Sequence, residues 1–299
     1  METKDKKLRI GISPCPNDTF AFHGIINGTI SLPFQVEFSI HDVEELNQKV
    51  LNGELHLSKV SFHLAAKVLN RYMILNSGAA LGRGCGPLLL KKELPDSSHN
   101  DPTELLKGST IAIPGSNTTA ALLLRLYLQK HGLSVAQGDI KLKGMLFSQI
   151  EDAILAQVVH AGTVIHETRF TYADRGLVKL ADLGEWWETE TGKPIPLGCI
   201  LGSRQLPIQT LSLFDNALKR SIEMAFRNPE PALEFAADHA REISMDVMKR
   251  HIDLYVNHYT LELGQEGREA IQTLFEMARQ AGILSGPAEQ SEIFVRAVS

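Results

Sequence analysis

Short apolar runs alternate with amphipathic stretches along the first ninety residues of the chain. A strand of buried type over 8–12 leads through a turn-rich loop into apolar helical residues. A second strand over 34–40 precedes a helix that Asp42 caps at its start and Gly53 ends. This succession of strands and helices predicts one α/β unit.

A second unit of the same kind follows a segment over 92–104 that holds two prolines and a run of turn formers. We expect the chain to cross between two lobes in this segment. Beyond it, the hydrophobic pattern predicts strands over 110–113, 141–146, 162–165 and 195–201, with helices over 118–130 and 148–158. Strands that alternate with helices indicate parallel sheets.

The last ninety residues are almost entirely helical in pattern. Helices are predicted over about 210–227, 230–240, 244–257 and 264–281. Because no strands accompany them, we expect these helices to pack back on the first unit. The predicted fold is a two-lobed α/β structure with a substrate cleft between the lobes. Residues 1–95 and 205–299 form its larger, discontinuous first lobe, and 96–204 form its smaller second lobe.

Composition and charge exclude several classes of protein. Hydrophobic residues make up 43% of the 299 residues and charged residues 22%, which is ordinary for a globular protein. A net charge of −5 without a long basic run argues against binding to nucleic acid. The start of the chain lacks the apolar segment that secretion requires, and no apolar stretch is long enough to span a membrane. We therefore expect a cytoplasmic protein.

The three cysteines lie far apart without a C-x-x-C pair, and the eleven histidines show no ligand spacing with cysteine or carboxylate. Neither a disulfide framework nor a metal site is predicted. Cys15 offers a thiol among other polar residues. No basic partner for it is visible in the sequence, which favours an inert cysteine over a nucleophile.

Four predicted strand ends carry polar residues: 13–19, 58–61, 115–119 and 166–169. In α/β folds, ligands bind beyond the carboxyl ends of the strands, where loops present backbone N–H groups and helix N-termini. These four loops form the predicted site. A small polar, anionic metabolite fits their chemistry.

His166 ends the apolar run over 161–165, which places an imidazole at the mouth of the predicted cleft. Imidazole is the side chain best matched to proton transfer near neutral pH, so His166 is the candidate catalytic base. The alternative is a histidine that only forms a hydrogen bond at the end of a strand. Glu167 either orients the imidazole or faces solvent.

The remaining polar candidates each allow a structural and a functional interpretation. The loop over 115–119 suits a carboxylate or phosphate-like group, although its hydroxyls equally serve as a helix N-cap. Asn17 and Asp18 either line the cleft or form the turn that enters a helix. Arg83 suits bidentate binding of a carboxylate, while the glycines around it are typical of a hinge. The Trp186–Trp187 pair either stacks on an aromatic substrate or packs between the lobes.

Several of these segments, taken together and in order, carry a family resemblance. They read SPCPNDTF from residue 13, SKVS from 58, GRG from 82, TTA from 118, IHE from 165, DLG from 182, WWE from 186 and PIPLG from 194. These motifs resemble those of the 1,4-dihydroxy-6-naphthoate synthase family, which belongs to the futalosine route to menaquinone. The resemblance runs through most of the chain.

The resemblance implies a periplasmic-binding-protein-like type II fold that acts as an enzyme without a cofactor. It implies conversion of cyclic dehypoxanthine futalosine to 1,4-dihydroxy-6-naphthoate, with release of dihydroxyacetone. The family's proton acceptor falls on His166. Its substrate contacts come from both lobes and fall on Lys59, Val60 and Ser61 and on Thr119 and Ala120, with Leu197 completing the wall. Thr118, directly before this pair, is also expected to bind the substrate. Asn17, Asp18 and Arg83 are expected to line the cleft, whereas Asn117 receives no role because family members vary there.

Two other functions stay open. Chorismate dehydratase shares the fold and the pathway and also converts a carboxylated metabolite, but the SPCPNDTF, IHE and WWE motifs favour the synthase. A non-catalytic small-anion-binding protein is the third possibility, and the absence of a signal peptide counts against it. We expect a monomer or a homodimer that binds one small-molecule substrate, with neither nucleic acid nor a membrane as a partner.

Overall fold

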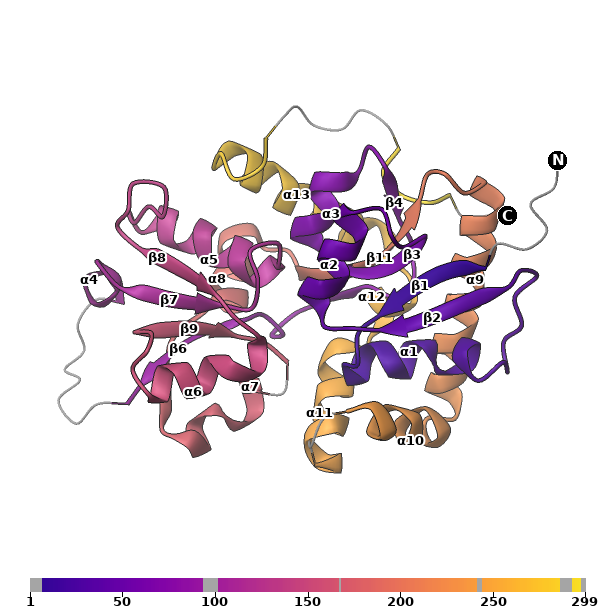
Figure 1. The fold of residues 1–299 in the computed structure, drawn as a ribbon, viewed down its shortest axis with the longest axis horizontal. Coiled ribbons are helices and arrows are strands. Elements are labelled where there is room, and N and C mark those ends of the chain that lie inside the picture. The colour runs from indigo at the N-terminus through magenta and orange to yellow at the C-terminus, as the bar shows by residue number, and fades with distance from the viewer. Residues whose placement is uncertain (1–6, 94–101, 167, 241–243, 286–291, 297–299) are drawn as a thin grey trace.

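The computed structural model describes residues 7–93, 102–166, 168–240, 244–285 and 292–296, and the chain forms two α/β lobes that lie side by side (Figure 1). The first lobe is built on a six-stranded sheet of order β2-β1-β3-β11-β4, with β5 paired to β11. Its strands are β1 (Leu8–Ile12), β2 (Val36–Ile40), β3 (Leu57–Ser61), β4 (Tyr72–Ile74), β5 (Ala80–Gly82) and β11 (Ile195–Ser203).

The second lobe holds a five-stranded sheet of order β10-β6-β9-β7-β8. Its strands are β6 (Leu88–Lys92), β7 (Thr110–Ile113), β8 (Lys141–Gly144), β9 (Ala161–Val164) and β10 (Leu177–Asp182). Strand β7 is parallel to β8 and β9, whereas β6 is antiparallel to β9 and β10.

The prediction of parallel sheets is wrong for part of each sheet. Strands β1, β2 and β3 are parallel, but β11 is antiparallel to β3, β4 and β5. The chain returns from the second lobe when it enters β11. Strand β11 therefore runs in the direction opposite to β3, β4 and β5, which precede the second lobe in the sequence. Strand β6 enters the second sheet in the opposite sense for the same reason.

The chain crosses between the sheets twice, after β5 and before β11. Because β6 already pairs in the second sheet, the first crossing lies at 83–87. The predicted crossing at 92–104 therefore comes too late in the chain, and its residues 94–101 lie outside the described residues. The predicted lobe boundaries at 95 and 205 each lie one strand beyond these crossings, because β6 belongs to the second sheet and β11 to the first.

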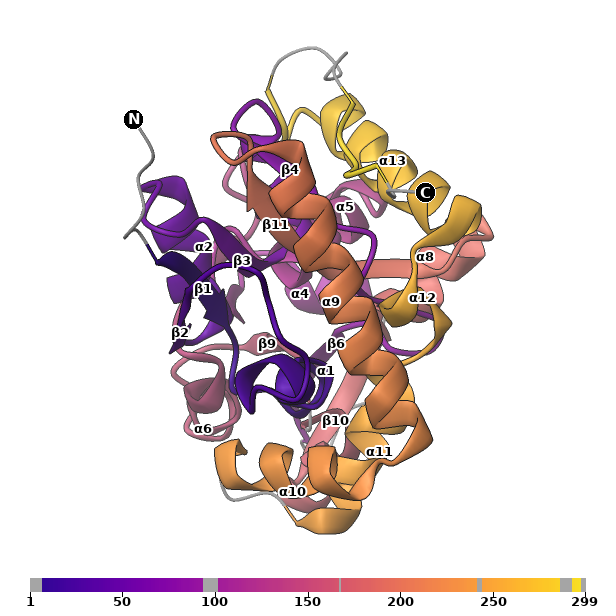
Figure 2. The same ribbon diagram turned by 90° about the vertical axis from the view of Figure 1, so that its right-hand side faces the viewer.

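Helices from the end of the chain cover the first lobe. Helix α1 (Pro16–Ile26) packs against α9 (Ile208–Arg227), α10 (Glu230–His239) and α11 (Met245–Tyr255). Figure 2 shows α9 running across the front of this lobe. The predicted helices near the C-terminus and their packing on the first lobe are confirmed.

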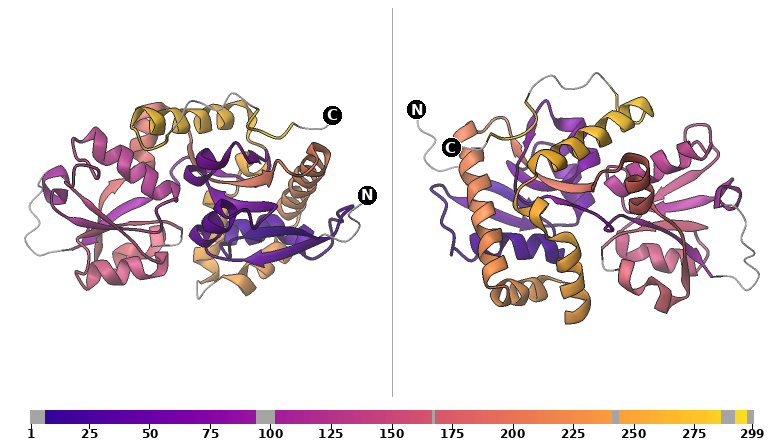
Figure 3. Two further views of the ribbon diagram at one scale, coloured as in Figure 1. Left: turned by 45° about the horizontal axis from the view of Figure 1, so that its top comes forward. Right: turned by 180° about the vertical axis from the view of Figure 1, so that it is seen from behind.

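Two further helices extend this layer. Helix α12 (His258–Leu261) contacts β5, and α13 (Gly264–Gln280) packs against β11 and α3 (Phe62–Val68) of the first lobe and against α5 (Thr119–Lys130) of the second. The yellow helix α13 therefore bridges the top of the two lobes in Figure 3. Helix α2 (Val43–Leu51) completes the first lobe beside β3.

The second lobe contains two elements that the sequence pattern does not predict, within the polar stretch that ends at Gly192. These are β10 and helix α8 (Leu183–Thr191), which Asp182 caps by accepting hydrogen bonds from the backbone N–H groups of residues 184 and 185. Trp187 is fully buried, and its Nε1 donates to the Pro194 carbonyl at 3.1 Å. The packing interpretation of the tryptophan pair therefore holds for Trp187.

The other helices of the second lobe are α4 (Pro102–Leu106), α6 (Ile150–Leu155) and α7 (Thr168–Thr171). The largest apolar cluster includes residues of both lobes, such as Phe62 of α3, Leu122 of α5 and Phe275 of α13. The two lobes thus share one continuous core near α13. None of the described helices is long and apolar enough to cross a membrane.

Candidate active site

A cavity lies between the two lobes and encloses about 620 Å³ of space, part of it open to solvent. The residues that line it are Ser13, Asn17, Asp18, Val43, Lys59, Val60, Ser61, Ala80, Cys85, Pro87, Thr118, Thr119, Ala120, Ile165, His166, Leu197, Gly198 and Tyr255. The structure therefore brings together the four polar strand ends that were singled out in the sequence.

Arg83 is the sequence-predicted site residue that does not line this cavity. Its side chain is 48% exposed and donates to the Glu266 carboxylate at 3.0 Å and to the Gly192 carbonyl at 3.1 Å. Arg83 lies on the segment where the chain first crosses between the sheets. Its contacts fit the hinge interpretation of the glycine-rich segment.

The N-terminus of α5 meets β11 and α3 of the first lobe at the cavity wall. Thr118 caps α5 by accepting a hydrogen bond from the Ala121 N–H at 3.3 Å. The Thr119 hydroxyl donates to the Leu197 carbonyl of β11 at 2.6 Å, and it lies 3.4 Å from the backbone nitrogen of His63. Thr119 thus joins the second lobe to the first at the cavity wall.

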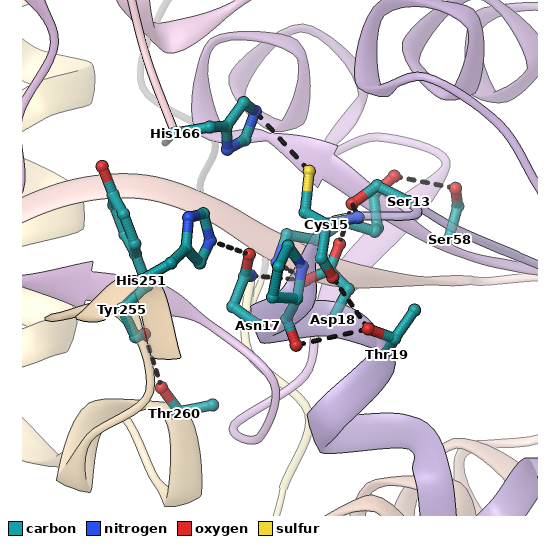
Figure 4. A network of polar contacts seen from close by, with 12 residues as sticks. Ser13, Cys15, Asn17, Asp18, Thr19, Ser58, His166, His251, Tyr255 and Thr260 are labelled. Atoms are coloured by element: carbon teal, nitrogen blue, oxygen red, sulfur yellow. Dashed lines mark hydrogen bonds and ion pairs between the residues drawn. The ribbon is translucent and has the colours of Figure 1, made fainter. Parts of the chain in front are cut away.

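His166 follows β9 directly and has a backbone φ of 57°, in the left-handed region. Among the described residues other than glycine, only Gln157 shares a positive φ. Such a conformation is costly for a residue with a side chain, and it is found at sites where geometry serves function. It turns the imidazole toward the first lobe, where Nε2 lies 3.6 Å from the sulfur of Cys15 (Figure 4). Glu167, predicted either to orient the imidazole or to face solvent, lies outside the described residues.

Asp18 is the centre of a buried network on the first lobe. Its carboxylate accepts hydrogen bonds from the Ser13 hydroxyl at 2.6 Å and from Asn17 Nδ2 at 2.8 Å. It also forms an ion pair with Lys59, whose side chain is almost fully buried. Because Asp18 neutralises this ammonium group, Lys59 does not present an unpaired cation to a ligand.

His251 joins this network and carries no motif that marks it in the sequence. One of its ring nitrogens, Nε2, lies 3.0 Å from Asn17 Oδ1. Its ring stacks on His166 with centroids 5.8 Å apart and planes 23° apart, and it packs on Tyr255 at 4.5 Å. Burial lowers the pKa of His251 well below its usual range, helped by the charges of His166 and Lys59. In the sequence it is simply one residue on the buried face of a helix.

Three side chains next to residues of the cavity wall link the two lobes, and we call Glu44, Lys67 and Asn117 the clasp. Asn117 Nδ2 donates to the Glu44 carboxylate at 2.9 Å, and Lys67 Nζ donates to Asn117 Oδ1 at 3.0 Å. Glu44 and Lys67 belong to the first lobe, whereas Asn117 precedes α5 of the second. The clasp therefore holds the two lobes together by side-chain hydrogen bonds.

Within the described ranges, no group of three or more histidine, cysteine or acidic side chains could hold a metal ion. Cys85 lines the cavity as a thiol, because burial raises its pKa to about 12. The chemistry that the described part of the cavity offers is therefore that of an imidazole, hydroxyls and a helix N-terminus.

Two α/β lobes that enclose a cavity between them define a periplasmic-binding-protein-like class, and solved structures agree. A crystal structure of a protein from Archaeoglobus fulgidus has a TM-score of 0.83 and 34% identity, and the match covers 93% of this chain and 98% of that one. The alkanesulfonate-binding protein SsuA from Xanthomonas axonopodis pv. citri, bound to MOPS, has a TM-score of 0.69 at 16% identity, with 98% of each chain covered. The predicted fold class is confirmed.

The sequence profile of a family described as menaquinone biosynthesis matches residues 8–280, and the chain belongs to this family. A 1,4-dihydroxy-6-naphthoate synthase from Thermus thermophilus is 41% identical over 276 residues, which is 92% of this chain and 95% of the relative. One from Streptomyces coelicolor is 39% identical over 277 residues, with 93% and 94% covered. The chain is an enzyme of menaquinone biosynthesis that acts on a small molecule.

Proposed function

We propose that this enzyme is a carbon–carbon lyase that converts cyclic dehypoxanthine futalosine to 1,4-dihydroxy-6-naphthoate and dihydroxyacetone, with His166 as the general base. Two relatives that carry the name 1,4-dihydroxy-6-naphthoate synthase support the reaction. The observation that carries the role of His166 is its left-handed backbone, which sets the imidazole at the wall of the cavity between the lobes.

His166 removes a proton from the bound substrate. The polycyclic substrate then fragments, and the gain of aromaticity in the naphthoate ring drives the reaction forward. Imidazole accepts a proton readily near neutral pH, and a positioned general base typically contributes about 10²–10⁴-fold in rate. The cavity holds no second imidazole on its described wall, so the role falls to His166.

The substrate carboxylate binds at the N-terminus of α5. The Thr118 side chain already caps the N–H of Ala121, which leaves the backbone N–H groups of Thr119 and Ala120 for an anion. Apolar side chains line the same cavity from the first lobe, Val60 and Leu197 among them, and they receive the carbon skeleton. Hydroxyls of Ser61 and Thr119 hold the substrate from opposite lobes, so binding couples to closure.

Mass spectrometry of products tests the reaction. Purified protein is incubated separately with cyclic dehypoxanthine futalosine and with chorismate, and we expect naphthoate and dihydroxyacetone only from the first. Turnover of chorismate alone would identify a dehydratase instead. Tight binding of either compound without turnover would identify a non-catalytic binding protein.

Substitution of His166 tests the base. We expect H166A to keep its fold and to lose about 10²–10⁴-fold in kcat. The matched control is H160N on the surface of the same lobe, where Nδ1 of the exposed His160 accepts from the Thr110 N–H at 3.0 Å. H160N is expected to keep wild-type turnover. A folded H166A protein with near-full turnover would remove His166 from the mechanism.

A further inference from the structure

We infer that His251 is a positioning residue for His166, and that closing the two lobes assembles this pair. The inference rests on the proposed role of His166 as the base. It assigns a function to a buried side chain that touches the base but does not line the cavity.

The two histidines come from different lobes. His166 follows β9 in the second sheet, whereas His251 lies on α11, which packs against α1 of the first lobe. Figure 4 shows the His166 ring reaching the side where Cys15 and His251 lie. The first lobe therefore supplies two of the neighbours of the His166 ring, at 3.6 Å for the sulfur of Cys15 and 5.8 Å between the ring centroids for His251.

The network around Asp18 fixes which nitrogen of His251 carries the hydrogen. A carboxylate only accepts hydrogen bonds, so the Nδ2 group of Asn17 faces Asp18 and its Oδ1 faces His251. An amide oxygen also only accepts, so Nε2 of His251 is the donor. The neutral ring then carries a bare Nδ1, which has no hydrogen-bond partner among the described residues.

Its surroundings keep His251 neutral while His166 takes up a proton. The charged and titratable groups around it are His166, Lys59 and Tyr255, with Asp18 beyond Asn17, and burial opposes any charge on its ring. The neighbouring cation Arg250 on α11 instead lies over the Phe170 ring, 4.6 Å from its centroid. A proton removed from the substrate therefore stays on His166.

A neutral, fixed ring is a suitable support for a base. It lies nearly parallel to the His166 ring, so it limits how that imidazole tilts without competing for the proton. When the lobes separate, the His166 ring loses this support together with the contact to Cys15. Correct orientation of the base is thus a property of the closed enzyme, which ties proton removal to a cavity shielded from water.

Two substitutions separate the ring contact from the hydrogen bond. H251Q keeps an amide donor for Asn17 but lacks the ring, so we expect kcat to fall about 10–100-fold with little change in KM. H251F keeps the ring but leaves Asn17 Oδ1 without its donor, so we expect a rise in KM, with kcat closer to that of the wild type. The control is H239Q on α10, where the imidazole bonds the Phe235 carbonyl of its own helix and wild-type kinetics are expected.

Nitrogen NMR of the histidine side chains provides a reading that does not depend on turnover. We expect the neutral Nε2–H form of His251 to persist at pH 5, and the ring signals of His166 to move in H251Q but not in H239Q. Lack of turnover by the wild type would contradict the proposed function. The NMR signals of the histidine rings would still test the contact between His166 and His251. The inference is overturned if folded H251Q and H251F both show wild-type kinetics and unmoved His166 signals. It is also overturned if the acidic limb of the pH profile disappears in these variants, since His251 would then be the base.

Discussion

The Nε2 atom of His166 lies 3.6 Å from the sulfur of Cys15, although 151 residues separate the two in the sequence. This contact supplies the basic partner that the sequence does not show for Cys15. It also crosses from one lobe to the other, because Cys15 directly precedes α1 and His166 directly follows β9. A change at Cys15 therefore reports both on the base and on closure.

Alkylation of Cys15 is expected to inactivate the enzyme. Cys85 and Cys199 are buried, which raises the pKa of both thiols, to about 12 for Cys85, and keeps them unreactive. N-ethylmaleimide is expected to add once per chain, at Cys15, and to lower turnover by about 10-fold or more because the adduct occupies the place of the His166 ring. Peptide mapping and activity assays measure both effects.

The control for alkylation is C15S. Because Cys15 is not the proposed nucleophile, this variant is expected to keep turnover within about 10-fold of the wild type and to resist the reagent. A loss in C15S as large as that in H166A would instead give the thiol a direct part in the chemistry.

Loss of the clasp is expected to weaken substrate binding. N117A removes the side-chain hydrogen bonds to Glu44 and Lys67, each worth roughly 0.5–3 kcal/mol. The closed form becomes less populated, so KM is expected to rise about 10-fold while kcat is kept. Steady-state kinetics and the radius of gyration by X-ray scattering check this. N52A, which removes a hydrogen bond within the first lobe, is the control.

Arg83 is expected to contribute little to substrate binding. R83A breaks ion pairs on an exposed side chain, and such pairs are worth about 0–1 kcal/mol. KM is therefore expected to stay within about 3-fold of the wild-type value. An increase in KM well beyond 3-fold in steady-state assays would show that Arg83 binds the substrate.

Stability is expected to fall as the pH decreases from 7 to 5. His63 is buried on α3, and burial lowers its pKa to about 3, with Lys67 as a further cause. The unfolded chain, with a histidine pKa near 6.5, binds a proton in this window that the folded chain does not, so the free energy of unfolding rises with pH between about 3 and 6.5. This residue alone accounts for about 2 kcal/mol between pH 7 and pH 5.

Urea denaturation of H63N at both pH values isolates the contribution of His63. The asparagine amide keeps a donor for the Thr118 carbonyl, which lies 3.2 Å from His63 Nδ1. The variant is expected to lose less stability than the wild type over this pH change. Equal losses in the two proteins would contradict a neutral, buried His63.

A methyl group at Gly86 is expected to destabilise the first crossing between the sheets. The β-carbon of an alanine would lie 2.3 Å from the Gly184 Cα. Relief of this clash requires a shift of the backbone at Gly184, which costs free energy. G86A is expected to lower the free energy of unfolding by about 1–3 kcal/mol. G144A is the matched control, since a methyl group there meets nothing within 4 Å. Thermal denaturation of both variants measures the difference.

Local patterns predict much of this fold. The helices of the last ninety residues follow from their amphipathic spacing, and α5 follows from Thr118 as its cap. The polar strand ends also identify most of the cavity wall, because the carboxyl ends of strands converge in this architecture. These features depend on residues that are close in the sequence.

Features that depend on residues far apart in the sequence cannot be predicted from such local patterns. The direction of β11 is set by its path back from the second lobe, which no local pattern records. Strand β10 and α8 lie in a charged stretch that hides their apolar face, including the buried Trp187. His251 stands out as a site residue only in the folded chain, where its ring stacks on His166. Arg83 lies outside the cavity wall and forms an ion pair with Glu266, a residue far away in the sequence.

The central place of β11 in the first sheet also sets an order of events during synthesis. Strand β11 pairs with β3 on one side and with β4 and β5 on the other, yet it is the last strand of either sheet to leave the ribosome. All five strands of the second lobe emerge before it, so that lobe can complete its sheet first. Until residue 203 is made, β3 of the nascent first lobe pairs only with β1, and β4 and β5 lack the strand that joins them to this sheet.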